Sequence, residues 1–170
     1  MLQPCTGINR VEKRSEGIKV MEYTQEEKIS RGYMAQAFPK LKKDYSDIQA
    51  CWDVSGQTST GKYIAEIKVR ELVTTAHTTA FLEVKKYDAV KEIADPLELT
   101  MFYFNVYYDD TLVWNLSLLP IDDYLKEKRW LPKSSTEPWK GYEWKDIIHL
   151  PIEAAQMKKG KGSDNMKKCI

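Results

Sequence analysis

Three charged side chains, Asp53, Glu66 and Lys68, have the types and spacing that a hydrolytic metal site requires. They lie in residues 50–71, where two runs of β-type residues flank a Ser/Thr/Gly-rich turn, a pattern that predicts a β-hairpin. If the turn centres between Ser59 and Thr60, Asp53 lies opposite Glu66 and on the same face. Lys68 shares that face because side chains along a strand alternate with a period of two. The hairpin therefore predicts two carboxylates and one ammonium close together.

Such a cluster suits phosphodiester hydrolysis. Two neighbouring carboxylates bind Mg²⁺ or Mn²⁺, which prefer hard oxygen ligands and keep several waters. The ion polarises the phosphodiester and lowers the pKa of an attacking water, and a lysine on the same face orients that water or neutralises charge on phosphorus. The alternative is a solvated strand face on which Glu66, Lys68 and Arg70 pair with neighbours across the sheet.

A helix expected upstream supplies a candidate third acid. Thr24 followed by Glu27 forms a capping box, and apolar residues then recur at helical spacing until Pro39 ends or kinks the helix. At about 100° per residue, Glu26 falls near the middle of the apolar face and Glu27 near its edge. The alternative explanation for Glu26 is that the helix dipole favours acids in a first turn.

The elements that follow indicate the fold class. Strands are expected over 80–84, 101–108 and 111–116, with a turn at Asp109-Asp110 and a helix over 86–94 that stops at Asp95-Pro96. The order helix, hairpin, strand, helix, hairpin predicts an α+β fold, with helices packed on a central mixed sheet.

Residues 118–156 are expected to be irregular, and they mix tryptophans with basic residues that include Lys128 and Arg129. Basic and aromatic residues together grip a phosphate backbone and stack on bases, so Lys128 and Arg129 are candidate nucleic-acid contacts. The alternative is a lid whose tryptophans cover the sheet. Residues 157–170 are Lys/Gly-rich and predict a disordered basic tail.

Length and composition narrow the function classes. A chain of 170 residues suits one domain, expected over residues 1–156. Because the net charge is only +1, any basic surface that binds nucleic acid would have to be local. Three irregularly spaced cysteines argue against a disulfide framework, and two histidines exclude most His-dependent catalysis. No apolar run reaches the roughly 18 residues of a membrane span, so a cytoplasmic protein without membrane contact is expected.

One nucleotide-binding motif is excluded. Residues 56–62 fit the first seven positions of a P-loop, but Tyr63 occupies the position where Ser or Thr must hold magnesium. A P-loop also opens a helix, whereas the residues after Lys62 alternate as a strand.

The order of elements and residues resembles the PD-(D/E)XK nuclease superfamily, in particular its compact phage- or Holliday-junction-resolvase-type members. The resemblance spans about residues 24–116. It implies a restriction-endonuclease-like αβββαβ core and hydrolysis of phosphodiester bonds in DNA with a divalent metal. Trp52 stands where many members of the superfamily have a proline.

The resemblance also implies roles for individual residues. Asp53 and Glu66 would ligate Mg²⁺ or Mn²⁺, with the carbonyl of Ile67 as a further ligand, and Lys68 would assist catalysis. The helix acid of the family maps to Glu26, with Glu27 in reserve.

A further polar residue on the following helix corresponds to Lys86 or Lys85. We therefore expect a magnesium-dependent endonuclease that binds DNA. Structure-specific or repair-linked cleavage, cleavage of RNA and assembly as a homodimer are left open. The alternative is a non-catalytic module that keeps the nuclease fold and binds nucleic acid or protein. A small nucleotide-binding protein ranks last.

Overall fold

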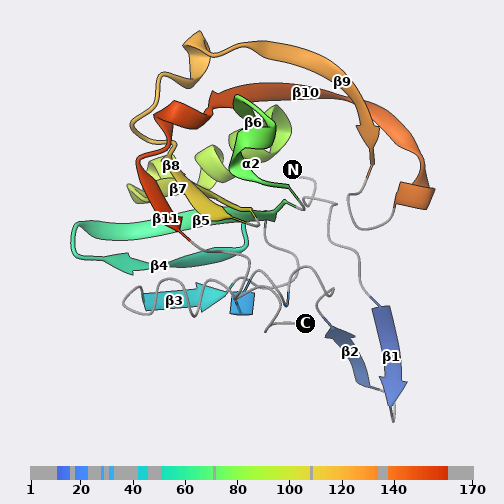
Figure 1. The fold of residues 1–170 in the computed structure, drawn as a ribbon. Helices are drawn as coiled ribbons and strands as arrows, with labels where there is room; N and C mark the ends of the chain where they lie inside the picture. The colour runs from blue at the N-terminus through green and yellow to red at the C-terminus, as the bar shows by residue number, and fades with distance from the viewer. Residues whose placement is uncertain are drawn as a thin grey trace.

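The computed structural model describes residues 11–15, 18–22, 28, 31–32, 42–45, 51–70, 72–107, 109–133 and 138–160. Its centre is a six-stranded sheet in the order β11-β8-β7-β5-β4-β3 (Figure 1). Strands β5 and β7 pair in parallel and the other neighbours are antiparallel, so the sheet is mixed. The predicted α+β class is confirmed. The strands are β3 (Lys42–Tyr45), β4 (Val54–Thr58), β5 (Gly61–Val69), β7 (Thr100–Val106), β8 (Asp110–Asn115) and β11 (Met157–Gly160).

Two smaller sheets and short helices complete the described structure. A three-stranded antiparallel sheet has the order β6-β10-β9, and β1 pairs with β2. These strands are β1 (Val11–Ser15), β2 (Ile18–Glu22), β6 (Thr79–Glu83), β9 (Lys126–Pro132) and β10 (Tyr142–Pro151). Helix α2 spans Val84–Ala94, and the 3₁₀ turns are η1 (Thr74–Ala76), η2 (Asp95–Leu97), η3 (Ile121–Asp123), η4 (Pro138–Lys140) and η5 (Ile152–Ala154).

The hairpin β4–β5 has the register that its turn predicts. Thr58 pairs with Gly61, which leaves Ser59 and Thr60 as the two turn residues. The Thr58 hydroxyl accepts a hydrogen bond from the Thr60 amide at 3.2 Å, and Gly61 has φ +150°, a conformation that favours glycine. A strand follows Lys62, as expected, so the P-loop is excluded by the backbone as well.

Helix α2 forms part of the crossover between the parallel strands β5 and β7. It begins at Val84, two residues before the predicted start, and ends where Asp95-Pro96 opens a 3₁₀ turn. Val90 and Ala94 are buried on its inner face. Figure 1 shows α2 beneath the arched strands β9 and β10. The helix is thus placed between the central sheet and the three-stranded sheet.

Alternation along β5 divides its side chains between two clusters. Ala65 and Ile67 pack on one face of the central sheet with Phe104 and Val113. Ile64 packs on the other face, in the cluster that contains α2 residues and the buried ends of β6 and β10. Glu66 and Lys68 alternate with Ala65 and Ile67, so the candidate site belongs to the α2 side of the sheet.

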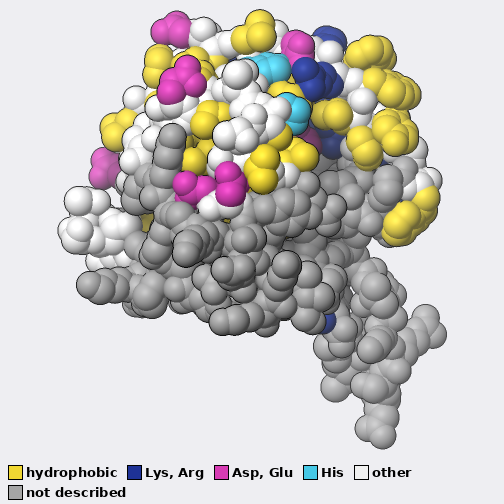
Figure 2. Space-filling view, viewed as in Figure 1, with side chains coloured by type: hydrophobic (Ala, Val, Ile, Leu, Met, Phe, Trp, Pro, Cys, Tyr) yellow, Lys and Arg dark blue, Asp and Glu magenta, His cyan; other side chains and the backbone are white. Residues whose placement is uncertain are grey.

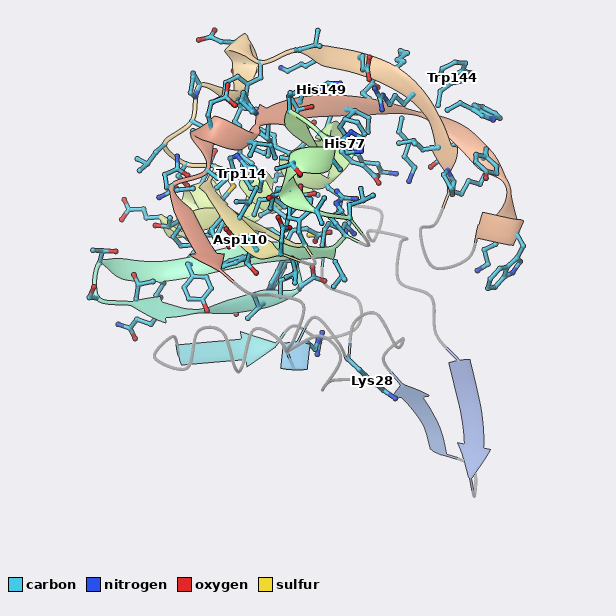
Figure 3. All side chains as sticks on the ribbon, viewed as in Figure 1. Lys28, His77, Asp110, Trp114, Trp144 and His149 are labelled. Atoms are coloured by element: carbon cyan, nitrogen blue, oxygen red, sulfur yellow. The ribbon has the colours of Figure 1, made fainter. Side chains whose placement is uncertain are left out.

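The expectation of an irregular stretch over residues 118–156 is wrong. Much of it forms β9 and β10, which pair with each other and, through β10, with β6. The tryptophans do not cover a sheet, because Trp130 is 56% exposed and Trp144 is 64% exposed. Exposed hydrophobic side chains gather where β9 and β10 arch over the molecule (Figure 2). Trp114, by contrast, lies inside, and Trp144 projects outward (Figure 3).

Both ends of the chain carry predictions that the structure covers only in part. In the predicted helix after Thr24, Lys28, Arg31 and Gly32 are helical, while Glu26 and Glu27 lie outside the described residues. The first four residues of the predicted tail form β11 beside β8, and residues 161–170 lie outside the described part of the chain. No helix within the described ranges is long and apolar enough to cross a membrane.

Candidate active site

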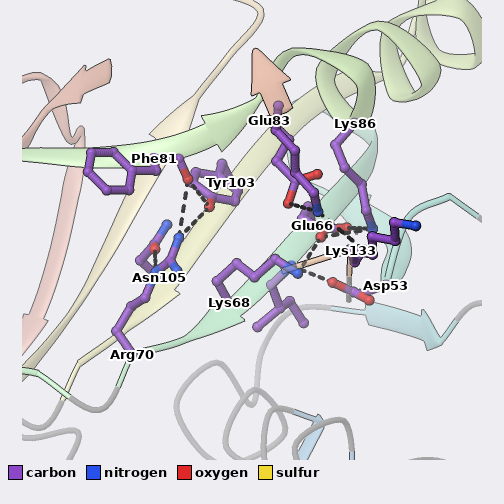
Figure 4. Close-up of polar contacts among 12 residues, drawn as sticks. Asp53, Glu66, Lys68, Arg70, Phe81, Glu83, Lys86, Tyr103, Asn105 and Lys133 are labelled. Atoms are coloured by element: carbon purple, nitrogen blue, oxygen red, sulfur yellow. Dashed lines mark hydrogen bonds and ion pairs between the residues drawn. The ribbon is translucent and has the colours of Figure 1, made fainter. Parts of the chain in front are cut away.

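Glu66 is the centre of the candidate site. It lies in the middle of β5 and is 4% exposed. Its Oε1 is 3.1 Å from the Nζ of Lys68, two residues along the same strand, and 3.0 Å from the Nζ of Lys86. Lys86 also donates to Oε2 at 3.2 Å. One buried carboxylate is therefore held between two ammonium groups (Figure 4).

Asp53 reaches the same segment of β5 from the residue that precedes β4. Its amide donates to the carbonyl of Ala65 at 3.0 Å, which extends the hairpin pairing by one step. Its Oδ2 accepts a hydrogen bond from the amide of Ile67 at 2.6 Å. The carboxylate thus lies against the backbone between Glu66 and Lys68, and the structure brings together the three residues that the hairpin pattern selected.

The charges of the cluster shift the pKa values of both acids. Burial, followed by the negative charge of Glu66, raises the pKa of Asp53 to about 7. Burial acts to raise the pKa of Glu66 as well, but the positive charges of Lys86 and Lys68 prevail and lower it to about 2. The Glu66 charge in turn raises the pKa of Lys68. At neutral pH Glu66 is ionised, whereas Asp53 is near the midpoint of its titration.

The donor set fits a magnesium-type ion that retains waters. Two carboxylates supply hard oxygen ligands, and Mg²⁺ is commonly held by one or two of them. Binding at Glu66 would require one or both lysines to move away from its oxygens, since both now contact Oε1. In the described ranges, no group of three His, Cys, Asp or Glu residues could hold a metal, and the predicted third acid, Glu26 or Glu27, lies outside them.

The predicted nucleic-acid contacts occupy three different environments. Lys86 lies in the site itself, on Glu66, while Lys85 is exposed and lines a cleft between α2 and β10. Lys128, on the outer face of β9, pairs with Asp146 at 3.1 Å. Arg129 faces inward, bonded to Glu127 and 4.2 Å from the centre of the Phe81 ring. Of the four, only Lys86 contacts a candidate catalytic residue.

A second polar network on the same side of the sheet escaped the sequence prediction. Arg70, two residues beyond Lys68, donates to Asn105 Oδ1 at 2.8 Å and to the Tyr103 hydroxyl at 3.1 Å. The Tyr103 hydroxyl donates to the carbonyl of Phe81 at 2.7 Å. Asn105 is fully buried, and a lone amide in the apolar run of β7 is the signal that could have revealed it. The network fixes the end of β5 against β7 and β6.

Comparison with known proteins finds a distant structural likeness. No family model matches the chain, and no curated protein matches it. Among solved structures, Hjc from Archaeoglobus fulgidus, a Holliday junction resolvase from an archaeal hyperthermophile, aligns with 10% sequence identity and a TM-score of 0.43. The alignment covers 72% of this chain and 95% of that one.

Proposed function

We propose that the chain is a divalent-metal-dependent nuclease that hydrolyses phosphodiester bonds in DNA. The observation that carries the proposal is the convergence of Asp53 and Glu66 on one segment of β5, with Lys68 in contact with Glu66. The described elements β4, β5, β6, α2 and β7 follow the order expected of a PD-(D/E)XK core. Buried acids with strongly shifted pKa values are also typical of functional sites.

Each residue has a distinct part in this mechanism. Asp53 and Glu66 would hold Mg²⁺ or Mn²⁺, which when bound supplies a Lewis acid and an activated water. Lys68 is held beside both carboxylates and would place its positive charge next to the phosphate under attack. Lys86, released from Glu66, would neutralise a phosphate oxygen of the substrate. Glu26 or Glu27 would add a third carboxylate.

The test compares cleavage of duplex, single-stranded and branched DNA by wild type, Glu66→Gln and Asp53→Asn in Mg²⁺ and in Mn²⁺. Wild type is expected to cut at least one substrate, and both variants should lose cleavage. Glu143→Gln is a matched control, because Glu143 is exposed and lies on β10. If wild type cuts none of these substrates with either metal, the proposal that the chain is a nuclease is refuted.

A non-catalytic module is the second candidate, and one observation favours it. Lys68 and Lys86 already neutralise Glu66, so the cluster is stable without an ion. Titration with Mn²⁺ separates the two functions, since only the nuclease requires an ion bound at Glu66. Cleavage of branched or recombination-linked DNA, a cytoplasmic location and a homodimer are further parts of the nuclease proposal.

A further inference from the structure

The outer face of the β9–β10 hairpin carries three exposed aromatic side chains. Trp130 and Trp144 are directly opposite each other in the register, and their ring centroids are 5.4 Å apart. Tyr142, 48% exposed, is two residues from Trp144 on the same face. Its ring is 6.4 Å from that of Trp130, with an angle of 18° between the planes. We call Trp130, Tyr142 and Trp144 the aromatic face.

An exposed group of this size is unusual for side chains without a binding role. Figure 2 shows hydrophobic side chains along the edge of the molecule where Figure 3 labels Trp144. The hairpin does not need these rings for its own core, because its inward side already packs Arg129 over Phe81 and buries Ile147. The aromatic face is therefore available to a ligand.

The charges around the aromatic face favour a polyanion. Residues 126–146 contain six Lys or Arg against four Asp or Glu, a net of +2 in a chain whose total is +1. Lys126 and Lys128 lie on the same strand face as Trp130, and their ion pairs with Asp122 and Asp146 are exposed. Exposed pairs of this kind are weak, so both lysines can turn to phosphates at little cost.

The acidic cleft that adjoins the aromatic face at Trp144 is unsuited to nucleic acid. The cleft between α2 and β10, of about 830 Å³, is lined by six carboxylates and three lysines. This excess of negative charge repels phosphates. The phosphates of a bound strand are therefore favoured on the Lys126 and Lys128 side of the aromatic face and disfavoured at the cleft, which Trp144 also lines.

The hairpin is also tied to the candidate active site. Lys145, next to Trp144, contacts Glu83 Oε1 at 3.2 Å and donates to the carbonyl of Lys133 at 3.3 Å. Glu83 is the residue that precedes α2, and the first turn of α2 places Lys86 on Glu66. Figure 4 shows Lys133 and Glu83 in the surroundings of Glu66. The hairpin and Glu66 are thus connected through the first turn of α2.

We propose that the aromatic face binds an unpaired, single-stranded segment of the substrate by stacking its bases on Trp130, Tyr142 and Trp144. This inference rests on the proposed nuclease function, which it makes more specific: the substrate contains single-stranded DNA beside the bond that is cut. Stacking on aromatic rings tolerates any base. The contact selects unpaired bases over duplex without a preferred sequence.

The test measures binding in EDTA, so that cleavage plays no part. The full-length protein is titrated with a fluorescein-labelled 20-mer of oligothymidylate and, separately, with a 20-base-pair duplex. Trp130→Ala and Trp144→Ala should each weaken oligothymidylate binding by about 10-fold or more and the double variant further, with a smaller effect on the duplex. Trp144→Phe, which keeps a ring, should retain most of the affinity. Leu118→Ala is the control, since Leu118 is also an exposed apolar side chain but lies outside the hairpin.

Two results would overturn the inference. One is wild-type affinity for oligothymidylate in both alanine variants. The other is that the alanine variants sediment as monomers where wild type sediments as a dimer, while their affinity for oligothymidylate is unchanged. The aromatic face would then be a contact between two copies of the chain. Failure of the nuclease proposal alone would give a different result: wild type would bind oligothymidylate in EDTA yet cut no DNA in Mg²⁺ or Mn²⁺.

Discussion

Replacement of Glu66 by glutamine tests the electrostatic structure of the site without reference to any metal. The substitution keeps the shape of the side chain but removes the charge that Lys68 and Lys86 contact at 3.1 and 3.0 Å. Both ammonium groups, which are partly buried, then have Asp53 as the remaining carboxylate of the described cluster. Removal of one partner from a buried ion pair is strongly destabilising, because the remaining charge loses its compensation.

The size of the effect follows from the pKa of Glu66. Its folded value of about 2 lies below the ordinary 4.5, so its ionised form stabilises the folded state by about 3 kcal/mol at neutral pH. Loss of the Glu66 charge also relieves its repulsion of Asp53, which offsets part of this loss. We expect Glu66→Gln to lower the free energy of unfolding by about 2–3 kcal/mol at pH 7.

Urea denaturation at pH 7 in EDTA measures this change as a lower midpoint with an unchanged slope. Because the pKa of Glu66 is lowered on folding, its contribution is fully present above pH 4.5 and is lost as the pH falls towards 2. The difference between wild type and Glu66→Gln should therefore shrink between pH 5 and pH 3. Glu143→Gln, which removes a half-exposed carboxylate at the distant separation of 4.0 Å from the Nζ of Lys145, should cost under about 1 kcal/mol. A loss below about 1 kcal/mol for Glu66→Gln, or a difference that widens in acid, would refute the reasoning.

Three further predictions follow from the same geometry. The pKa of Asp53 is raised to about 7, so a proton competes with the ion for this carboxylate, and the apparent Kd for Mn²⁺ should rise about tenfold per pH unit below 7. Calorimetry on Asp53→Asn should show weaker Mn²⁺ binding that lacks this pH dependence. A wild-type Kd that does not change with pH would contradict the prediction. Lys68→Met should slow DNA cleavage by about 10²–10³-fold while Mn²⁺ affinity does not fall; weaker Mn²⁺ binding would mean instead that Lys68 positions the carboxylates. Gly61→Ala should lower stability by about 1–2 kcal/mol because of its φ of +150°, with no steric clash, since no atom lies within 4 Å of the added Cβ; a cost no greater than that of Thr60→Ala in urea denaturation would count against it.

The local parts of the site were predictable from the sequence. The Ser59-Thr60 turn and the alternation along β5 sufficed for the register that brings Asp53 to the backbone beside Glu66. Helix α2 was predictable because its apolar spacing ends at Pro96. In both cases, neighbours in sequence determine the geometry.

The long-range parts were not predictable. Lys86 approaches Glu66 across 20 residues, and only the packing of α2 on the sheet brings them together. The β9–β10 hairpin lacks apolar alternation, because its inner face uses Glu127 and Arg129, bonded to each other, where most strands place aliphatic residues. Its outer face carries Trp130 and Trp144, so the usual contrast between an apolar inside and a polar outside is reversed.

The central claim is that Asp53 and Glu66 hold a divalent ion together. Its most direct test is an anomalous difference map from crystals of the wild-type protein soaked in Mn²⁺. We predict a peak bridging the two carboxylates, with Lys86 Nζ displaced from Glu66. A map without a peak at this position, in which Glu66 keeps its contacts with both lysines, would contradict the claim.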